Sequence, residues 1–383
     1  MRQELAPPVV LPTMGRPAFL APAFLDQTRT DASYDAAMRI FYGVNAQQQG
    51  HFARAAQIVP ELQRRGHIVQ TLTSGLPLDS MPSWASQRHE HFPGLPYRQE
   101  SGATDLAGTA RDWLADLPAT LRHRRRVKRL ARDFAPDLVI SDFEFYTGSP
   151  GLGLDCPIVS ACRQVAVLDP NIPLPPHEAR GRGLTRTVIR LFAMGADRRL
   201  AYHFAPESAR CLPPMLRTEL TEIEPTAGDA LLVYNSQHFG AGGDAGSLVT
   251  WADDRNVRVK AYGYRDEPRG LRGRVEFRPA SREGMLADLA ACRAVATTAG
   301  FALPLEAAVL GKPCLTVPLP GQWEQSVNAW QLEQLGYSRA SDRWDFDAAC
   351  DLPPPTVPPE ARRWLLTPLP RIVDALLAAA RSL

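Results

Sequence analysis

The sequence predicts an α/β protein built from two doubly wound domains. Its 383 residues are too many for one ordinary core at about 150 residues per domain, and 45% of them are apolar, as in a typical globular protein. A strand, a helix and a strand follow one another from Met38, and a second such series begins after a polar stretch at 216–229. We therefore expect two parallel sheets covered by helices.

The first series opens with the apolar run MRIFYGV (38–44), which is typical of a buried parallel strand. The segment 45–67 turns and then carries apolar residues at helical spacing, and IVQTLTS (68–74) predicts the next strand. The remaining elements expected in this half are a helix over 104–133, strands at 136–142 and 156–163, and helical material over 184–209.

The second series predicts strands at 230–236, 257–264, 275–280, 294–300 and 313–319, with helices at 245–255, 282–292, 302–311 and 325–335. The 35 prolines cluster towards both ends and in loops, where the missing N–H does least harm. We expect a Pro-rich extension (1–37), a first domain (38–220), a second domain (228–359) and a C-terminal helix (360–383) that crosses back to the first domain.

Charge and cysteine content exclude several classes of protein. The 43 basic and 41 acidic residues leave a net charge of +2, so no broad surface for nucleic acid is expected. Six scattered cysteines form no C-x-x-C pair, which argues against a zinc site and a disulfide scaffold. Neither a signal peptide nor a membrane-spanning run is visible, so a cytoplasmic protein is expected.

A basic run, HRRRVKR (123–129), falls within the predicted helix over 104–133. It favours a solvated helix face, and the alternative is peripheral contact with an anionic membrane. No adjoining exposed apolar signature is visible in the sequence, which makes the membrane alternative the weaker one.

The most informative stretch is 294–335. A strand ends at Thr298, and the turn at Ala299 and Gly300 opens a helix, an arrangement whose backbone N–H groups can bind a phosphate. Glu306 follows in the same helix, where a carboxylate can accept hydrogen bonds from ribose hydroxyls. The loop after the next strand offers Gln322, Glu324 and Gln325 to sugar hydroxyls. An ordinary strand–helix–strand unit with polar loops is the alternative.

Two residues of the first domain predict acid–base chemistry. His51 lies where the first strand passes into the first helix, and Asp142 ends the strand PDLVISD (136–142). An imidazole with a pKa near 6.5 can take a proton from a hydroxyl at neutral pH, and a carboxylate on its far nitrogen fixes the tautomer. A structural histidine is the alternative, and Glu144 is the competing carboxylate, either as base or as an acceptor ligand.

The segment TTAGFALPLEAAVLGKPCLTVPLPGQWEQSVNA resembles the donor-nucleotide signature of GT-B glycosyltransferases. It is most similar to the family-28-like, MJ1255-type group, which is related to the lipid II-forming N-acetylglucosaminyltransferase. The resemblance implies two Rossmann-like domains that face a central cleft, with the acceptor in the first and a UDP-sugar such as UDP-GlcNAc in the second. It also implies a cytoplasmic monomer or homodimer that needs no cofactor and no metal, since no D-x-D motif stands at a strand end.

The same resemblance assigns roles to individual residues. It implies that Glu306 binds the ribose and that Glu324 and Gln325 bind the donor sugar. The residues implied around the diphosphate are Thr298, Ala299, Gly300, Phe301 and Asn328. For Asn328 the alternative is a helix cap.

The sequence departs from the family pattern in two places. The loop that is usually Gly-rich reads NAQQQGH (45–51), with amide side chains such as Gln49 where glycines are expected. The second departure is ACRQ (161–164), where an Asp-His-Gln-like element is usual. Gln49, Arg163 and Gln164 are therefore expected to contact a different acceptor, together with Glu144, and a plain surface role for Arg163 and Gln164 is the alternative.

The function predicted from these features is inverting, metal-independent transfer of a sugar from a nucleotide sugar to a small-molecule or lipid-linked acceptor. His51 is the expected base, supported by Asp142. Two rivals remain: an NDP-sugar 2-epimerase of the same fold, and a non-catalytic partner that binds a nucleotide sugar.

Overall fold

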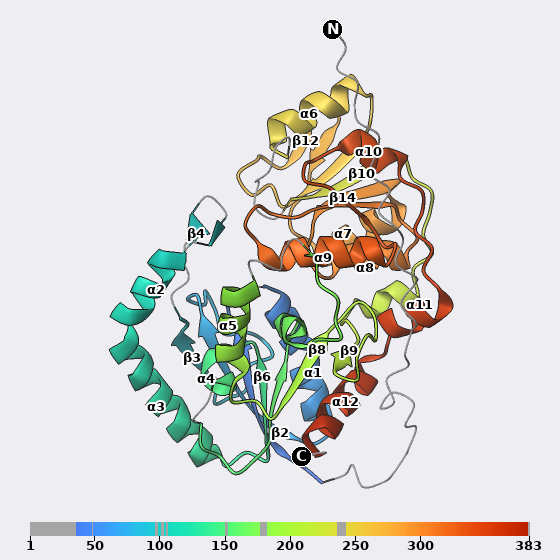
Figure 1. Ribbon diagram of the computed structural model, residues 1–383. Coiled ribbons are helices and arrows are strands. Elements are labelled where there is room, and N and C mark those ends of the chain that lie inside the picture. The colour runs from blue at the N-terminus through green and yellow to red at the C-terminus, as the bar shows by residue number, and fades with distance from the viewer. Residues whose placement is uncertain are drawn as a thin grey trace.

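A computed structural model shows two seven-stranded sheets, one in each half of the chain (Figure 1). The structure describes residues 36–47, 49–95, 99–100, 103–104, 106–149, 152–176, 182–235 and 243–381. The Pro-rich extension therefore lies almost entirely outside the described residues. Within them, no helix is long and apolar enough to cross a bilayer.

The first sheet has the strand order β3-β2-β1-β6-β7-β8-β9, and each paired neighbour runs parallel. Its strands are β1 (Arg39–Asn45), β2 (Ile68–Gly75), β3 (Glu90–Pro93), β6 (Leu138–Asp142), β7 (Ile158–Ala161), β8 (Arg198–Tyr202) and β9 (Cys211–Leu212). Its helices are α1 (Gln49–Arg64), α2 (Leu106–Ala115), α3 (Leu117–Phe134), α4 (Phe145–Gly148) and α5 (Arg182–Ala193). A small antiparallel pair, β4 (Gln99–Glu100) and β5 (Ala103–Thr104), precedes α2.

The second sheet has the order β12-β13-β11-β10-β14-β15-β16, and only β12 pairs antiparallel within it. Its strands are β10 (Leu231–Tyr234), β11 (Val259–Tyr262), β12 (Gly270–Arg272), β13 (Val275–Phe277), β14 (Ala294–Thr298), β15 (Cys314–Val317) and β16 (Arg339–Ala340). Its helices are α6 (Ala245–Asp254), α7 (Arg282–Ala291), α8 (Leu303–Val309), α9 (Trp323–Gln334) and α10 (Phe346–Asp351). The α/β prediction is confirmed for both halves.

Local sequence explains how α1 and β1 reach their positions. The apolar face of α1 is fully buried and consists of Ala55, Ile58, Val59 and Leu62. Gly43 in β1 lets α4 approach the strand, because a Cβ there would lie 2.2 Å from Thr147 Oγ1. The buried face of α1 packs on the first sheet, and the helix begins just after the carboxyl end of β1.

Three helix predictions need correction. The helix expected over 104–133 is two helices, α2 and α3. The helical material expected over 184–209 ends with α5, and β8 follows it. β8 begins with Arg198 and Arg199, so its sequence does not resemble a buried strand, although its last three residues are buried. The last expected helix is interrupted before Pro368 and forms α11 (Pro359–Leu365) and α12 (Leu369–Arg381).

The two halves meet along one face. Helices α8 and α9 lie on the side of the second sheet that faces the first domain, and α11 and α12 lead from the second domain down to the first (Figure 1). Helix α12 packs against α1 and β7. Contacts between the domains join residues that follow β7 and β8 to α9 and to the turn before α8.

Candidate active site

His51 and Asp142 meet at the carboxyl edge of the first sheet. β1 and β6 are parallel neighbours, and Val44 pairs in register with Asp142, so the start of α1 lies beside the end of β6. His51 Nδ1 lies 2.7 Å from Asp142 Oδ1, and both residues are buried. When the Nδ1 proton points to the carboxylate, Nε2 is left unprotonated and can accept a proton.

Arg54 is a third member of this group, which sequence reasoning missed. Its Nη2 and Nε donate to Asp142 Oδ1 at 2.7 Å and Oδ2 at 2.9 Å, and Nη2 also lies 2.7 Å from His51 Nδ1. Burial raises the pKa of Asp142, the charges of Arg54 and His51 lower it, and the net pKa is below the usual value. The available signal was helical spacing, since Arg54 stands one turn after His51.

The imidazole of His51 is also fixed by an aromatic stack. The Phe143 ring lies nearly parallel to the imidazole, with ring centroids 6.1 Å apart. Phe192 in turn stacks on Phe143, with ring centroids 4.7 Å apart. Phe143 has φ 53°, a left-handed conformation that a bulky residue adopts only when its surroundings impose it. The turn after β6 thus presents Phe143 to the histidine.

Glu144 does not fit the expected acceptor or base role. It caps α4, accepting from the backbone N–H groups of Tyr146 and Thr147, and its side chain also accepts from Thr147 Oγ1 and Ser74 Oγ. Burial raises the pKa of Glu144, and these donors oppose the rise. Because both oxygens are occupied inside the fold, the expectation is corrected to a structural role. The side chain of Gln49 lies outside the described residues.

The turn expected to bind the diphosphate differs from the prediction in its backbone. The Ala299 N–H donates to Val317 O at 3.3 Å, and the Gly300 N–H donates to Thr298 O at 2.7 Å. These two N–H groups are therefore occupied in this arrangement and do not point at a ligand. The space above the turn is open, since a Cβ on Gly300 would meet only Thr298 O, at 4.0 Å.

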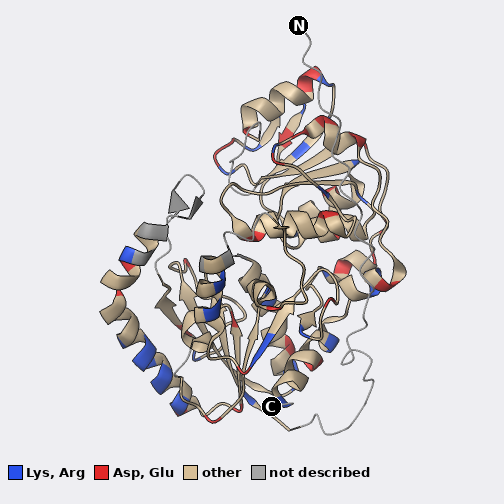
Figure 2. Ribbon diagram, in the orientation of Figure 1, with Lys and Arg blue, Asp and Glu red and all other residues tan. Residues whose placement is uncertain are grey.

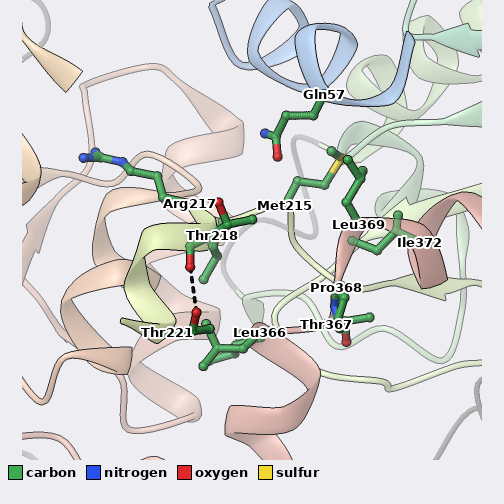
Figure 3. A pocket seen from close by; sticks show the side chains of 12 residues that line it. Gln57, Met215, Arg217, Thr218, Thr221, Leu366, Thr367, Pro368, Leu369 and Ile372 are labelled. Atoms are coloured by element: carbon green, nitrogen blue, oxygen red, sulfur yellow. Dashed lines mark hydrogen bonds between the residues drawn. The ribbon is translucent and has the colours of Figure 1, made fainter. Parts of the chain in front are cut away.

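Glu306 is buried in α8 and faces Arg217 of the segment that joins the domains, with Oε2 3.0 Å from Nη2. Burial raises the pKa of Glu306, and the charge of Arg217 opposes the rise. Arg217 also lines a pocket of about 170 Å³ between this segment and the α11–α12 crossing (Figure 3). The carboxylate expected to hold ribose therefore lies beside the interdomain connection.

The three polar residues expected near the donor sugar surround the start of α9. Gln322 precedes the helix, and the Gln325 side chain accepts from Leu319 N at 3.0 Å. Glu324 Oε2 accepts from the Gln164 amide of the first domain at 3.0 Å. Glu324 and Gln164, expected to bind donor and acceptor, thus contact each other across the cleft.

A second contact across the cleft joins Arg163, at the end of β7, to α9. The Arg163 guanidinium donates to Asn328 Oδ1 at 3.2 Å through Nε and Nη2, and Nη2 also donates to Gln331 Oε1. Asn328 lies inside α9 and donates to Ala299 O at 3.2 Å, so the helix-cap alternative is wrong. Phe301 stacks on Phe204 of the first domain, with centroids 4.9 Å apart.

These contacts close the cleft around the expected donor site. A pocket of only about 10 Å³ remains among residues that include Arg163, Gln164, Trp323, Glu324 and Asn328. Sites for small ligands usually enclose about 300–1,000 Å³. This particular pocket is therefore too small for a nucleotide sugar while these side chains stay in contact.

The chain has one D-x-D sequence, DFD (345–347), and both of its carboxylates contact other residues of the protein. Asp345 caps α10 by accepting from Ala348 N at 2.9 Å. Asp347 forms an exposed ion pair with Arg255 at 2.9 Å. Both carboxylates thus have structural partners.

Two Rossmann-like α/β domains packed against each other form the architecture of the GT-B glycosyltransferases. The family model described as Glycosyl transferase family 1 matches residues 38–351, and the chain belongs to this family. The GT-B expectation is confirmed, whereas the narrower family-28-like, MJ1255-type assignment stays a prediction.

Solved structures share the fold at low sequence identity. The glycotransferase of kitacinnamycin is 15% identical with a TM-score of 0.55, covering 90% of this chain and 94% of that one. CalG4, the calicheamicin glycosyltransferase, is 17% identical with a TM-score of 0.55, covering 91% and 98%. MurG of Acinetobacter baumannii is 14% identical with a TM-score of 0.52, covering 91% and 100%. No curated protein matches the sequence significantly.

Proposed function

We propose that this glycosyltransferase moves a sugar from a nucleotide sugar, a UDP-sugar such as UDP-GlcNAc, to a hydroxyl of its acceptor. Transfer would invert the anomeric carbon and require no metal ion or cofactor. The second domain would hold the donor and the first domain the acceptor. The observation that carries the proposal is the 2.7 Å contact between His51 Nδ1 and Asp142 Oδ1 at the cleft edge of β1 and β6.

The chemistry follows from the tautomer in which His51 Nδ1 carries the proton. Asp142 holds the Nδ1 proton, so Nε2 accepts the proton of the acceptor hydroxyl as the oxygen attacks the anomeric carbon. The new C–O bond forms on the face opposite the diphosphate, whose bond to the sugar breaks with its electron pair. One such displacement inverts the configuration, and the imidazolium that forms is stabilised by the Asp142 carboxylate.

Two classes of acceptor are candidates. The glycotransferase of kitacinnamycin and the calicheamicin glycosyltransferase are named for natural products, which favours a small molecule from specialised metabolism. A lipid-linked acceptor of cell-envelope biosynthesis is the second candidate, and it rests on the sequence resemblance to the lipid II-forming N-acetylglucosaminyltransferase.

Turnover of a His51→Ala variant tests the proposal. We expect kcat to fall by at least about 10²-fold, the usual contribution of a positioned base. The matched control is His67→Gln, because His67 is also a buried histidine but its Nδ1 accepts from Met38 N outside the cleft. Wild-type turnover by His51→Ala would refute the base assignment.

Two additions to the assay test the rest of the proposal. Turnover in EDTA should equal turnover without it, and a loss restored by a divalent cation would contradict metal independence. NMR of UDP-GlcNAc with the enzyme and no acceptor should show no C2 epimer, whose appearance would favour the epimerase rival.

A further inference from the structure

Arg163 is a buried cation that forms no ion pair within the described part of the chain. The residue is 4% exposed, and its Nη1 is buried without a hydrogen-bond partner. Its other nitrogens donate only to the neutral amide oxygens of Asn328 and Gln331. Burial lowers the pKa of Arg163 to about 10, while Glu324 and Glu207 act on it from a longer range and oppose the fall. Burial of a charge that donates hydrogen bonds only to neutral groups costs free energy unless an opposite charge lies in contact with it.

The position of Arg163 indicates which counter-charge would fit. Its partner Asn328 is bonded to Ala299, in the turn where the resemblance expects the diphosphate. Its guanidinium lies 4.5 Å from the Phe204 ring centre and 5.5 Å from that of Phe301, so the two aromatic residues orient it. All its hydrogen bonds go to the second domain, although β7 belongs to the first.

We propose that Arg163 reaches across the cleft to bind the diphosphate of the donor, and not the acceptor. This inference rests on the proposed nucleotide-sugar transfer. The guanidinium would exchange the amide oxygens of Asn328 and Gln331 for phosphate oxygens, which a planar fork of donors binds with two parallel hydrogen bonds. It would then neutralise the charge that the diphosphate gains as its bond to the sugar breaks. Binding of a donor to the second domain would thus change the contacts that Arg163 of the first domain makes.

The exchange involves the amide partners of Arg163 and the small pocket beside it. Asn328 and Gln331 accept from Nε and Nη2 of Arg163, and the pocket of about 10 Å³ beside them cannot hold a diphosphate. When the donor enters, the amide partners are replaced and the buried Nη1 gains an acceptor. Arg163 therefore has hydrogen-bond partners in both states but a counter-ion only in the bound one.

The test compares dissociation constants for UDP and for uridine, which lacks the phosphates. A hydrogen bond to a charged group corresponds to roughly a 10- to 100-fold change in affinity. Arg163→Gln should therefore weaken UDP binding by at least about tenfold and leave uridine binding unchanged. Arg163→Lys, which keeps the charge, should recover part of the loss. Arg255→Ala removes an exposed arginine outside the cleft and should bind both ligands as the wild type does.

Three results would overturn the inference. If Arg163→Gln leaves the UDP affinity unchanged and raises the KM for the acceptor, Arg163 binds the acceptor and not the diphosphate. Equal losses for UDP and uridine would indicate a general role in closing the cleft. A wild-type protein that binds none of UDP, dTDP, GDP and ADP would refute the proposed function itself, and the inference with it.

Discussion

Asp142 is the residue on which the proposed base depends, and His51 and Arg54 both contact it. His51 contacts Oδ1, while Arg54 contacts both oxygens, so the carboxylate is completely buried but fully paired. Removing one partner of a buried ion pair typically costs about 3–5 kcal/mol, because the other charge remains buried. Arg54 therefore contributes to stability as well as to the geometry of the site.

Arg54→Ala should lower the free energy of unfolding at pH 7 by about 3 kcal/mol or more. Because the pKa of folded Asp142 lies below its unfolded value, the ionised carboxylate stabilises the fold at neutral pH. This contribution is lost as the pH falls through the folded pKa, so the difference between variant and wild type should narrow below about pH 4. Urea denaturation at several pH values measures both effects.

Arg64→Ala is the matched control on the same helix. Arg64 is 68% exposed and pairs with Glu61 one turn away, and an exposed pair contributes at most about 1 kcal/mol. Equal stability of the Arg54→Ala and Arg64→Ala variants would show that Arg54 is not needed to compensate the buried carboxylate.

At the scale of elements, three exposed apolar side chains of the first domain lie on or next to its most basic helix. Leu114 of α2 is 74% exposed, and Leu117 and Leu121 of α3 are also exposed. Leu117, Leu121 and Arg125 follow one another at four-residue spacing, and the basic segment of α3 lies along the outer edge of the domain (Figure 2). The expectation that no apolar signature adjoins the basic run is therefore wrong.

Peripheral contact of the stripe of Leu117, Leu121 and Arg125 with anionic bilayers, the alternative interpretation of the basic run, stays a prediction. A basic residue near such a surface contributes about 1 kcal/mol, so Arg122→Glu with Arg125→Glu should lower the partition coefficient by at least about 30-fold. Flotation with anionic vesicles measures it, and neutral vesicles should bind weakly. The control reverses Arg339 and Arg343, which are as exposed on the second domain. Equal partitioning of both double variants would contradict the proposal.

Edge elements were the hardest to predict from the sequence. β3, β9, β12 and β16 are two to four residues long, too short for a period-two pattern to stand out. The central strands β1, β6, β10 and β14 were predicted because both faces are buried, which makes them continuous apolar runs. Their carboxyl ends located the site, since ligands of open α/β sheets bind there.

For the whole molecule, the last helix completes the core of the first domain. Ile372, Val373, Leu376 and Leu377 of α12 are buried with the side chains of α1 and β1 in one cluster. Arg65 at the end of α1 pairs with Asp374 at 2.6 Å. Because these residues come from the end of the chain, the first domain cannot finish packing before the second has been made.

Leu376→Ala should lower the free energy of unfolding by about 2–5 kcal/mol, the usual cost of emptying a buried leucine site. Leu376 is fully buried, whereas Leu271 is 76% exposed, so Leu271→Ala should change stability by no more than about 0.5 kcal/mol. Chemical denaturation compares the two variants. A Leu376→Ala variant as stable as the wild type would show that α12 does not support the first domain.

The sequence by itself determined the two α/β series and the strand ends that carry His51, Asp142 and Gly300. It could do so because hydrophobic periodicity, helix starts and strand ends are local properties of the chain. It also carried the glycosyltransferase signature in one continuous segment, 294–335.

Only the tertiary structure decided which of these side chains meet. Arg54 joins Asp142, Glu306 faces Arg217, and Arg163 crosses to Asn328 from 165 residues away. Glu144, chosen from its place after a strand, proved to be a helix cap. Such pairings depend on how two domains and their connections pack, and no local pattern encodes the distance between atoms that distant segments bring together.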